Sequence, residues 1–156
     1  MDRFLHEDRV CVVGKAVSDF TGVSDFYETS LEGSGSLLQL SSLHMNLFGS
    51  APAETFQVQT ESLDSYFGVE TCLDMLWIDV QGAEMKVLIG ASDLLNRTSA
   101  VFIEVSVQPN LYNGSPSFDE IHSFLKSKNF HLAGLGMDCN LTGNALYIRQ
   151  PLLNRI

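Results

Sequence analysis

The hydrophobic pattern of the first half of the chain predicts short strands around a long loop. Residues 9–17 are rich in β-branched side chains and predict a strand, and residues 23–27 predict a second strand that forms a hairpin with it. Residues 29–50 are rich in Ser and Gly and predict a loop, of a length that is usually functional or mobile. Residues 55–60 alternate between polar and apolar side chains, which indicates a strand with one solvated face, and residues 62–67 predict one helical turn.

From residue 75 onward the apolar runs become continuous. Residues 75–80 and 100–105 predict buried strands of a parallel sheet, each with an acid near its end. The other expected elements are a helix over residues 83–89 that stops at Gly90, a helix over residues 120–128 behind the capping box of Ser117 and Glu120, a strand over residues 130–135, a turn at Gly143 and Asn144, and a strand over residues 145–148. This order, β-α-β-α-β-β, predicts a parallel sheet covered on both faces.

Two acids stand at the places where such a sheet binds ligands. Ligands of parallel α/β sheets lie beyond the carboxyl ends of the strands. Asp79 and Glu104 are predicted to lie at two of those ends. Both are therefore candidate site residues.

The segment 77–88 joins a strand to a helix through a short turn. Asp79 would lie at the strand end, Gly82 would allow a sharp turn and a close ligand, and Glu84 would lie in the first turn of the helix. Carboxylates are favoured at such positions for structural reasons alone, because they cap turns and complement the helix dipole. Spacing by itself leaves the structural and the functional interpretation open.

Composition narrows the class of protein. The chain has 156 residues, an apolar fraction of 45% and a net charge of -10, which indicate one domain with a core of its own. No cluster of Lys and Arg is present, so nucleic-acid binding is not expected. No apolar run approaches the length of about 20 residues that crosses a membrane. Three widely spaced cysteines favour a reducing compartment, so a cytoplasmic protein is expected.

Several segments, in order, resemble the FkbM family of S-adenosylmethionine (SAM)-dependent methyltransferases. The most specific match is Ile78-Asp79-Val80-Gln81-Gly82-Ala83-Glu84, followed by Val87–Ala91 and by Phe102–Val105. Further matches are Ala16–Asp19 with Gly22, Thr60–Asp64, Phe118–Leu125 and Gly143–Ile148. The resemblance covers almost the whole chain and is weakest from residue 28 to residue 50.

The resemblance implies a fold and a reaction. The expected fold is α/β, with the Rossmann-like sheet of class I methyltransferases, mostly parallel with an antiparallel C-terminal strand. The expected cofactor is SAM, and the expected reaction is methylation of a hydroxyl on a sugar or small-molecule acceptor. Such an enzyme must align the acceptor oxygen with the methyl group and take its proton.

The resemblance also implies roles for individual residues. Asp79 is expected beside the methyl group, as the carboxylate that orients the acceptor or as the base, and with Val80 it is expected to contact the cofactor. Glu84 is a candidate second carboxylate, for proton relay or for a divalent cation, and Gln81 is a candidate hydrogen-bond partner of the acceptor. Glu104 is expected to hold the site together. Two carboxylates alone do not define a metal site, so none is predicted.

The front of the chain departs from the family. Family domains begin with a strand, a glycine-rich turn and a helix, then a second strand that ends in an acid, and residues 1–9 resemble neither strand. We therefore expect an N-terminally truncated domain over residues 1–156, with exposed sheet edges and apolar faces. Self-association, or a partner chain that covers the missing strands, is expected to follow.

Two other functions are weighed against the enzyme. A methyltransferase remnant without catalytic activity would act as a binding or interaction module. A small acidic binding module of unrelated ancestry would account for the composition but not for the ordered motifs.

Overall fold

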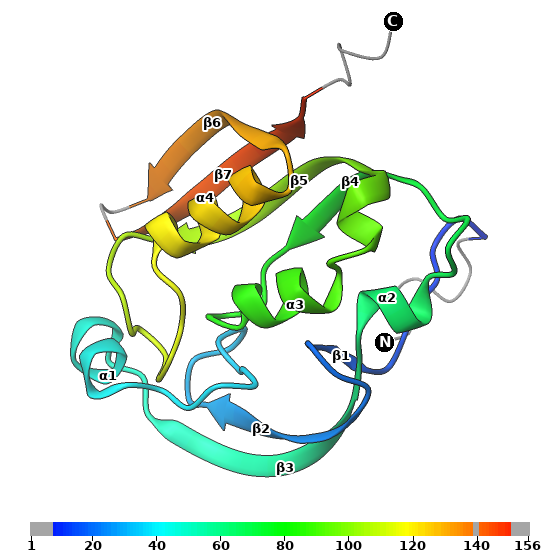
Figure 1. The fold of residues 1–156 in the computed structure, drawn as a ribbon. Helices are drawn as coiled ribbons and strands as arrows, with labels where there is room; N and C mark the ends of the chain where they lie inside the picture. The colour runs from blue at the N-terminus through cyan, green and yellow to red at the C-terminus, as the bar shows by residue number, and fades with distance from the viewer. Residues whose placement is uncertain (1–7, 139–140, 151–156) are drawn as a thin grey trace, which may run out of the picture.

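The structure, a computed structural model, describes residues 8–138 and 141–150, and Figure 1 shows two β-sheets. The first sheet contains β1 (Ala16–Val17), β2 (Gly22–Thr29) and β3 (Pro52–Glu61) in the order β1-β3-β2. β3 is central, pairing in parallel with β1 and antiparallel with β2. The long connection between β2 and β3 therefore returns the chain to its own sheet.

The predicted hairpin between residues 9–17 and 23–27 is wrong. β1 is only two residues long, and it lies on the opposite edge of β3 from β2. Val10, Val12 and Val13 are exposed and belong to no strand. β-branched composition predicted the extended backbone, but it carries no information on which strand is the partner.

The second sheet has four strands in the order β4-β5-β7-β6. β4 (Leu73–Ile78) and β5 (Thr98–Ser106) are parallel, whereas β7 (Thr142–Arg149) pairs antiparallel with both β5 and β6 (Phe130–Asp138). Helix α3 (Glu84–Gly90) and a 3₁₀ helix (Leu94–Arg97) connect β4 to β5, and α4 (Phe118–Ser127) connects β5 to β6. The predicted order β-α-β-α-β-β is confirmed.

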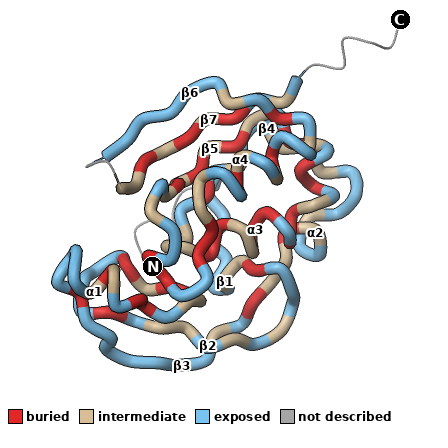
Figure 2. The backbone as a smooth tube through the Cα atoms, turned by 60° about the vertical axis from the view of Figure 1, so that its left-hand side comes forward, coloured by how far each residue is buried: buried red, intermediate tan, exposed pale blue. Residues whose placement is uncertain are grey.

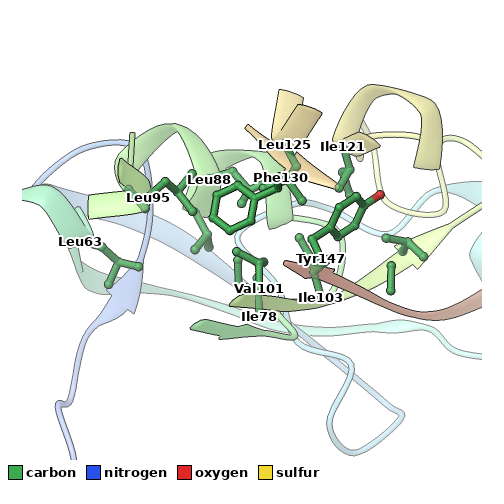
Figure 3. Close-up of a cluster of buried hydrophobic side chains, with 14 of the residues drawn as sticks. Leu63, Ile78, Leu88, Leu95, Val101, Ile103, Ile121, Leu125, Phe130 and Tyr147 are labelled. Carbon is green, nitrogen blue, oxygen red and sulfur yellow. The ribbon is translucent and has the colours of Figure 1, made fainter. Parts of the chain in front are cut away.

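The helices cover one face of this sheet and form the main core with it. Val101 and Ile103 of β5 and Tyr147 of β7 are fully buried there, against Leu88 of α3 and Leu125 of α4 (Figure 3). α4 begins with the predicted capping box, in which Ser117 and Glu120 each satisfy a backbone N–H of the other. Burial of these side chains holds the helices on the sheet.

Residues 8–138 and 141–150 leave the other face of the sheet uncovered, so for them the prediction of a sheet enclosed on both faces is wrong. Trp77 and Met75 of β4 are 69% and 52% exposed, although their sequence is continuously apolar. The Trp77 and Phe102 rings lie against each other on this face, with centroids 4.7 Å apart. In the part of the chain that the structure describes, β4 pairs with β5 alone.

The segment predicted as a loop over residues 29–50 contains helix α1 (Ser42–Phe48). Ser41 caps the helix by accepting a hydrogen bond from the His44 backbone N–H, and the Ser41 hydroxyl donates to the Leu111 carbonyl oxygen. Leu40, Leu111 and Tyr112 form a second, small core that seats the helix. Tertiary contacts, absent from any local pattern, order this segment. Helix α2 (Leu63–Tyr66), capped by Ser62, confirms the helical turn predicted at residues 62–67.

Gly143 and Asn144 lie inside β7, so the turn predicted there is wrong. A Cβ atom on Gly143 would stand 2.2 Å from the carbonyl oxygen of Gly136 in β6. This glycine therefore allows a close approach of two strands. β6 and β3 are largely exposed, while buried residues concentrate in α3, β5 and β7 (Figure 2).

The fold is thus mixed α/β, with two separate sheets. Among the strands described, two pairs are parallel and three are antiparallel, so the expected single, mostly parallel sheet is not what these residues form. The antiparallel C-terminal strand is confirmed in β7. None of the helices in the described residues is long and apolar enough to span a membrane.

Gly90→Ala is expected to lower the free energy of unfolding by about 1–3 kcal/mol, the range for overpacked sites. Gly90 is the last residue of α3, and a Cβ there would stand 2.1 Å from the Ser18 carbonyl oxygen. Urea denaturation followed by circular dichroism measures the change. Gly68→Ala is the matched control, because a Cβ at Gly68 meets no atom within 4 Å. Equal stability of the two variants would contradict the packing argument.

Candidate functional site

The site is built on the turn that leaves β4. Ile78 ends the strand in the core, and the next residues reverse through left-handed backbone at Gln81 (φ 54°) and Gly82 (φ 93°). A Cβ at Gly82 would stand 2.8 Å from the Tyr112 ring, so a larger residue would displace that ring. A positive φ at Gln81 is uncommon outside glycine and marks a backbone that its surroundings hold in place.

Glu84 supports this turn from the first turn of α3. One of its carboxyl oxygens, Oε1, accepts hydrogen bonds from the backbone N–H groups of Val80 (3.3 Å) and Gly82 (3.0 Å). Burial raises the pKa of Glu84, against the opposing effect of these backbone hydrogen bonds. One oxygen of Glu84, the predicted second carboxylate, is therefore occupied by hydrogen bonds to the backbone.

Gln81 joins the other side chains of the site. Its Nε2 donates to Asp79 Oδ1 (2.6 Å) and to Glu104 Oε2 (3.3 Å), while its Oε1 accepts from the Tyr112 hydroxyl (3.2 Å). The single O–H hydrogen of Tyr112 is shared between this amide oxygen and the Ser34 carbonyl oxygen, which is the closer acceptor (2.9 Å). Because a phenol O–H occupies the amide oxygen, the amide nitrogen faces the two carboxyl groups. Asp79 directly follows β4, as predicted, while Glu104, predicted near the end of its strand, lies two residues before the end of β5.

The carboxyl groups shift the titration of their neighbours. Burial, and then the negative charges of Asp79 and Glu84, raise the pKa of Glu104 to about 7, with a smaller contribution from Asp138. Burial and the same cluster of carboxylates raise the pKa of Tyr112 above its usual range, so its hydroxyl remains a donor at neutral pH. Glu104 is thereby poised to gain or lose a proton near neutrality.

Two cavities meet at Gln81. The first, of about 180 Å³, is lined by the side chains of His44, Gln81, Glu84, Glu104 and Tyr112, with apolar walls that include Ile121. The second, of about 400 Å³, is lined by Lys15, Val17, Phe26, Gly33, Asp79 and Val80, and again by Gln81. Asp79 and Glu104 are linked through one amide, yet they line different cavities.

His44 enters the first cavity from α1. Its Nδ1 lies 2.7 Å from the Ser50 hydroxyl, and its ring packs on Tyr112 with centroids 5.0 Å apart. Burial lowers the pKa of His44, so the imidazole is neutral at physiological pH.

The predicted residues divide between the two cavities. Gln81 and Glu84 line the first, whereas Asp79 and Val80 line the second, which Gln81 also reaches. Their chemical roles stay predictions. In the described residues, no group of three or more His, Cys, Asp or Glu side chains is arranged to hold a metal ion.

Sequence reasoning missed Tyr112. It lies in the long connection after β5, which no periodicity singles out. Its place after the carboxyl end of a parallel strand was the one available signal, because such loops line ligand sites.

Comparisons with known proteins show relatives of the chain. The family model described as "Methyltransferase FkbM domain" matches residues 6–132. The chain is 30% identical over 138 residues to the 2-O-methyltransferase NoeI of Sinorhizobium fredii (strain NBRC 101917 / NGR234). The alignment covers 75% of this chain and 56% of that protein. The chain thus spans about half the length of the curated relative it matches. No solved structure matches it.

Glu104→Gln is expected to raise the melting temperature at pH 8 and to change it little at pH 4. The pKa of Glu104 lies above its ordinary value of 4.5, so the folded state holds the proton more tightly than the unfolded chain does. Stability from this group is complete below pH 4.5 and is lost as the pH rises through about 7. Because the glutamine amide of the Glu104→Gln variant does not ionise, the variant avoids this loss of stability at high pH.

The prediction is tested by measuring the melting temperatures of the wild type and of Glu104→Gln between pH 4 and pH 8. The exposed Glu54→Gln on β3 is the control and should show no pH-dependent difference. A Glu104→Gln protein less stable than the wild type at pH 8 would contradict the electrostatic account.

Proposed function

Because the chain belongs to the FkbM methyltransferase family, we propose that it transfers a methyl group from SAM to a hydroxyl of a sugar or small-molecule acceptor. The observation that carries the proposal is the position of Gln81, whose side chain borders two cavities and bonds a carboxyl group in each. Transfer between two bound molecules needs two adjoining sites with their reacting atoms in line. The activity of the whole protein stays a proposal, because the relative is about twice as long as its matched part.

The larger cavity is assigned to the cofactor. SAM would supply a methyl group on a positively charged sulfur, and the carboxylate of Asp79 is an opposite charge on this cavity's wall. Phe26 offers an aromatic surface, and Gly33, with φ 85° and no atom within 4 Å of a Cβ position, leaves space for a ligand. The volume of about 400 Å³ lies within the usual range for small-molecule sites, roughly 300–1,000 Å³. Asp79 and Phe26 suit a ligand with a positive charge and an aromatic ring, and Lys15 on the same wall is paired with Glu61.

The smaller cavity is assigned to the acceptor hydroxyl. Gln81, with its amide orientation held by Tyr112, would hydrogen-bond the acceptor at the boundary with the cofactor cavity. Glu84 would hold the turn in place, since its Oε1 is bonded to the backbone. The apolar walls would exclude water from the reacting oxygen. Proton relay by Glu84 is less favoured by this geometry than support of the turn.

Calorimetric titration of SAM into the purified chain tests the proposal. We expect 1:1 binding, and we expect Asp79→Asn to weaken it at least about tenfold, the size of a lost charge-assisted interaction. Asp25→Asn, an exposed change on β2, is the control and should bind as the wild type does. A folded chain with no affinity for SAM would reject the cofactor assignment.

An interaction function is a second candidate, and the uncovered sheet face favours it. An exposed apolar face beside a strand edge is a common site for strand addition. We propose that the occupant is a polypeptide equivalent to the part of the curated relative outside the alignment, which would add a strand to β4 and cover Trp77. This candidate is compatible with the enzyme, because that polypeptide would complete the same domain.

The single tryptophan of the chain reports on this face directly. We expect Trp77 fluorescence of the isolated chain to be strongly quenched by acrylamide, because its side chain is 69% exposed. Co-expression with the unaligned part of the Sinorhizobium relative should shift the emission to the blue and protect it from quenching. Protection that grows with the concentration of the isolated chain alone would instead identify a second copy as the occupant.

A further inference from the structure

Glu104 differs from the other carboxyl groups of the site in what surrounds it. It projects from β5 away from the core side, because its neighbours Ile103 and Val105 are buried and its own side chain is only half-buried. It lines the cavity assigned to the acceptor, whereas Asp79 lines the cavity assigned to the cofactor. The Gln81 amide bonds both groups at 3.3 Å and 2.6 Å, respectively.

A base for an acceptor hydroxyl must reach the acceptor and must change its protonation state near neutral pH. Three charged groups from the surrounding elements face Glu104, and all three are acidic. They are Asp79 after β4, Glu84 of α3 and Asp138 of β6. Tyr112 lines the same cavity as a neutral donor, and His44 lines it from α1. No Lys or Arg lines this cavity, so no cation there stabilises the anionic form of Glu104, whose one side-chain donor is the Gln81 amide at 3.3 Å.

We infer that Glu104 is the catalytic base that takes the proton of the acceptor hydroxyl, while Asp79 serves the cofactor side. This inference rests on the proposed methyl transfer. The acceptor O–H bond breaks and its proton bonds to a Glu104 oxygen. The freed electron pair on the acceptor oxygen forms the bond to the methyl carbon. The bond from carbon to sulfur breaks with its pair on sulfur, which leaves a neutral thioether, and the Glu104 proton then passes to water.

The other two groups of the acceptor cavity are less suited to this step. Glu84 Oε1 accepts two backbone hydrogen bonds, and moving that carboxyl group would release the turn at Gly82. His44 has Nδ1 held by Ser50, and it comes from α1 rather than from the turn after β4 that carries Gln81. Of Glu84, His44 and Glu104, only Glu104 is hydrogen-bonded to the Gln81 amide that borders both cavities.

Transfer of a radiolabelled methyl group from SAM to a panel of methyl hexopyranosides, from about pH 5.5 to about pH 9, tests the inference. We expect kcat/KM of the wild type to fall below an apparent pKa of about 7. Glu104→Gln should lower kcat about 100-fold or more and abolish that pH dependence, with SAM affinity unchanged by calorimetry. Glu54→Gln, exposed on β3, should behave as the wild type does.

Two results from this assay would overturn the role of Glu104. One is a Glu104→Gln enzyme that keeps the wild-type rate and pH profile. The other is a profile whose acidic limb disappears in His44→Gln instead, which would identify His44 as the base. A wild-type chain that binds SAM and methylates no acceptor would reject the proposed function itself, a separate outcome that the variants do not produce.

A second measurement decides without turnover. In protein labelled with ¹³C at the Glu carboxyl carbon, the signal missing from Glu104→Gln identifies Glu104, and its chemical shift is followed against pH. We expect a titration midpoint of about 7, before and after addition of SAM. A midpoint near about 4.3, the value of an unperturbed glutamate, would overturn the inference even if the variant were inactive.

Discussion

The hydrogen bonds of one side chain, Gln81, organise the site. The residue has an uncommon left-handed backbone conformation, and its amide is shared between Tyr112 on one side and Asp79 and Glu104 on the other. The strain of that conformation is offset by the contacts that surround the turn. If the amide rotated, its oxygen would face two carboxyl groups, and the Tyr112 hydroxyl would keep only the Ser34 carbonyl oxygen as acceptor. The hydrogen bonds that join the two cavities therefore depend on the orientation of one amide.

That arrangement has an electrostatic cost. Asp79, Glu84 and Glu104 gather at one end of the sheet, and no lysine or arginine lines the cavity between Glu84 and Glu104. Glu104 responds by holding its proton to about pH 7. Glu84 is buried and Glu104 is half-buried, and carboxyl groups withdrawn from water without a cation destabilise a fold. The proposed role of Glu104 as a base would account for keeping these charges together.

The fold supplies the rigid parts and the loops supply the chemistry. The buried side chains of β5 and the helices α3 and α4 hold the ends of β4 and β5 side by side. The second core, formed by Leu40, Leu111 and Tyr112, brings two distant loops together over that end. His44 and Tyr112 line the smaller cavity, and this small core holds the segments that carry them. Loops held on a rigid scaffold in this way can vary while the sheet is kept.

Local patterns in the sequence predicted the order of the elements from β4 onward and the first carboxyl groups. Continuous apolar runs that end in acids predicted β4, β5 and the neighbouring positions of Asp79 and Glu104, because parallel strands bring their carboxyl ends to one edge. The capping box at Ser117 predicted the start of α4, because its hydrogen bonds span only three residues. The motif around Asp79 predicted the family, which the matching residues 6–132 confirm.

Only the tertiary structure decided which elements are partners and which surfaces are covered. Contacts between segments far apart in the chain decide that β2 pairs with β3, that α1 is a helix, and that Trp77 is exposed. The same is true of Tyr112, which meets Gln81 across 31 positions of sequence. An apolar side chain favours burial, but only the folded chain decides which segment covers it. For this reason the acids could be predicted from the sequence, while the assignment of each acid to a cavity could not.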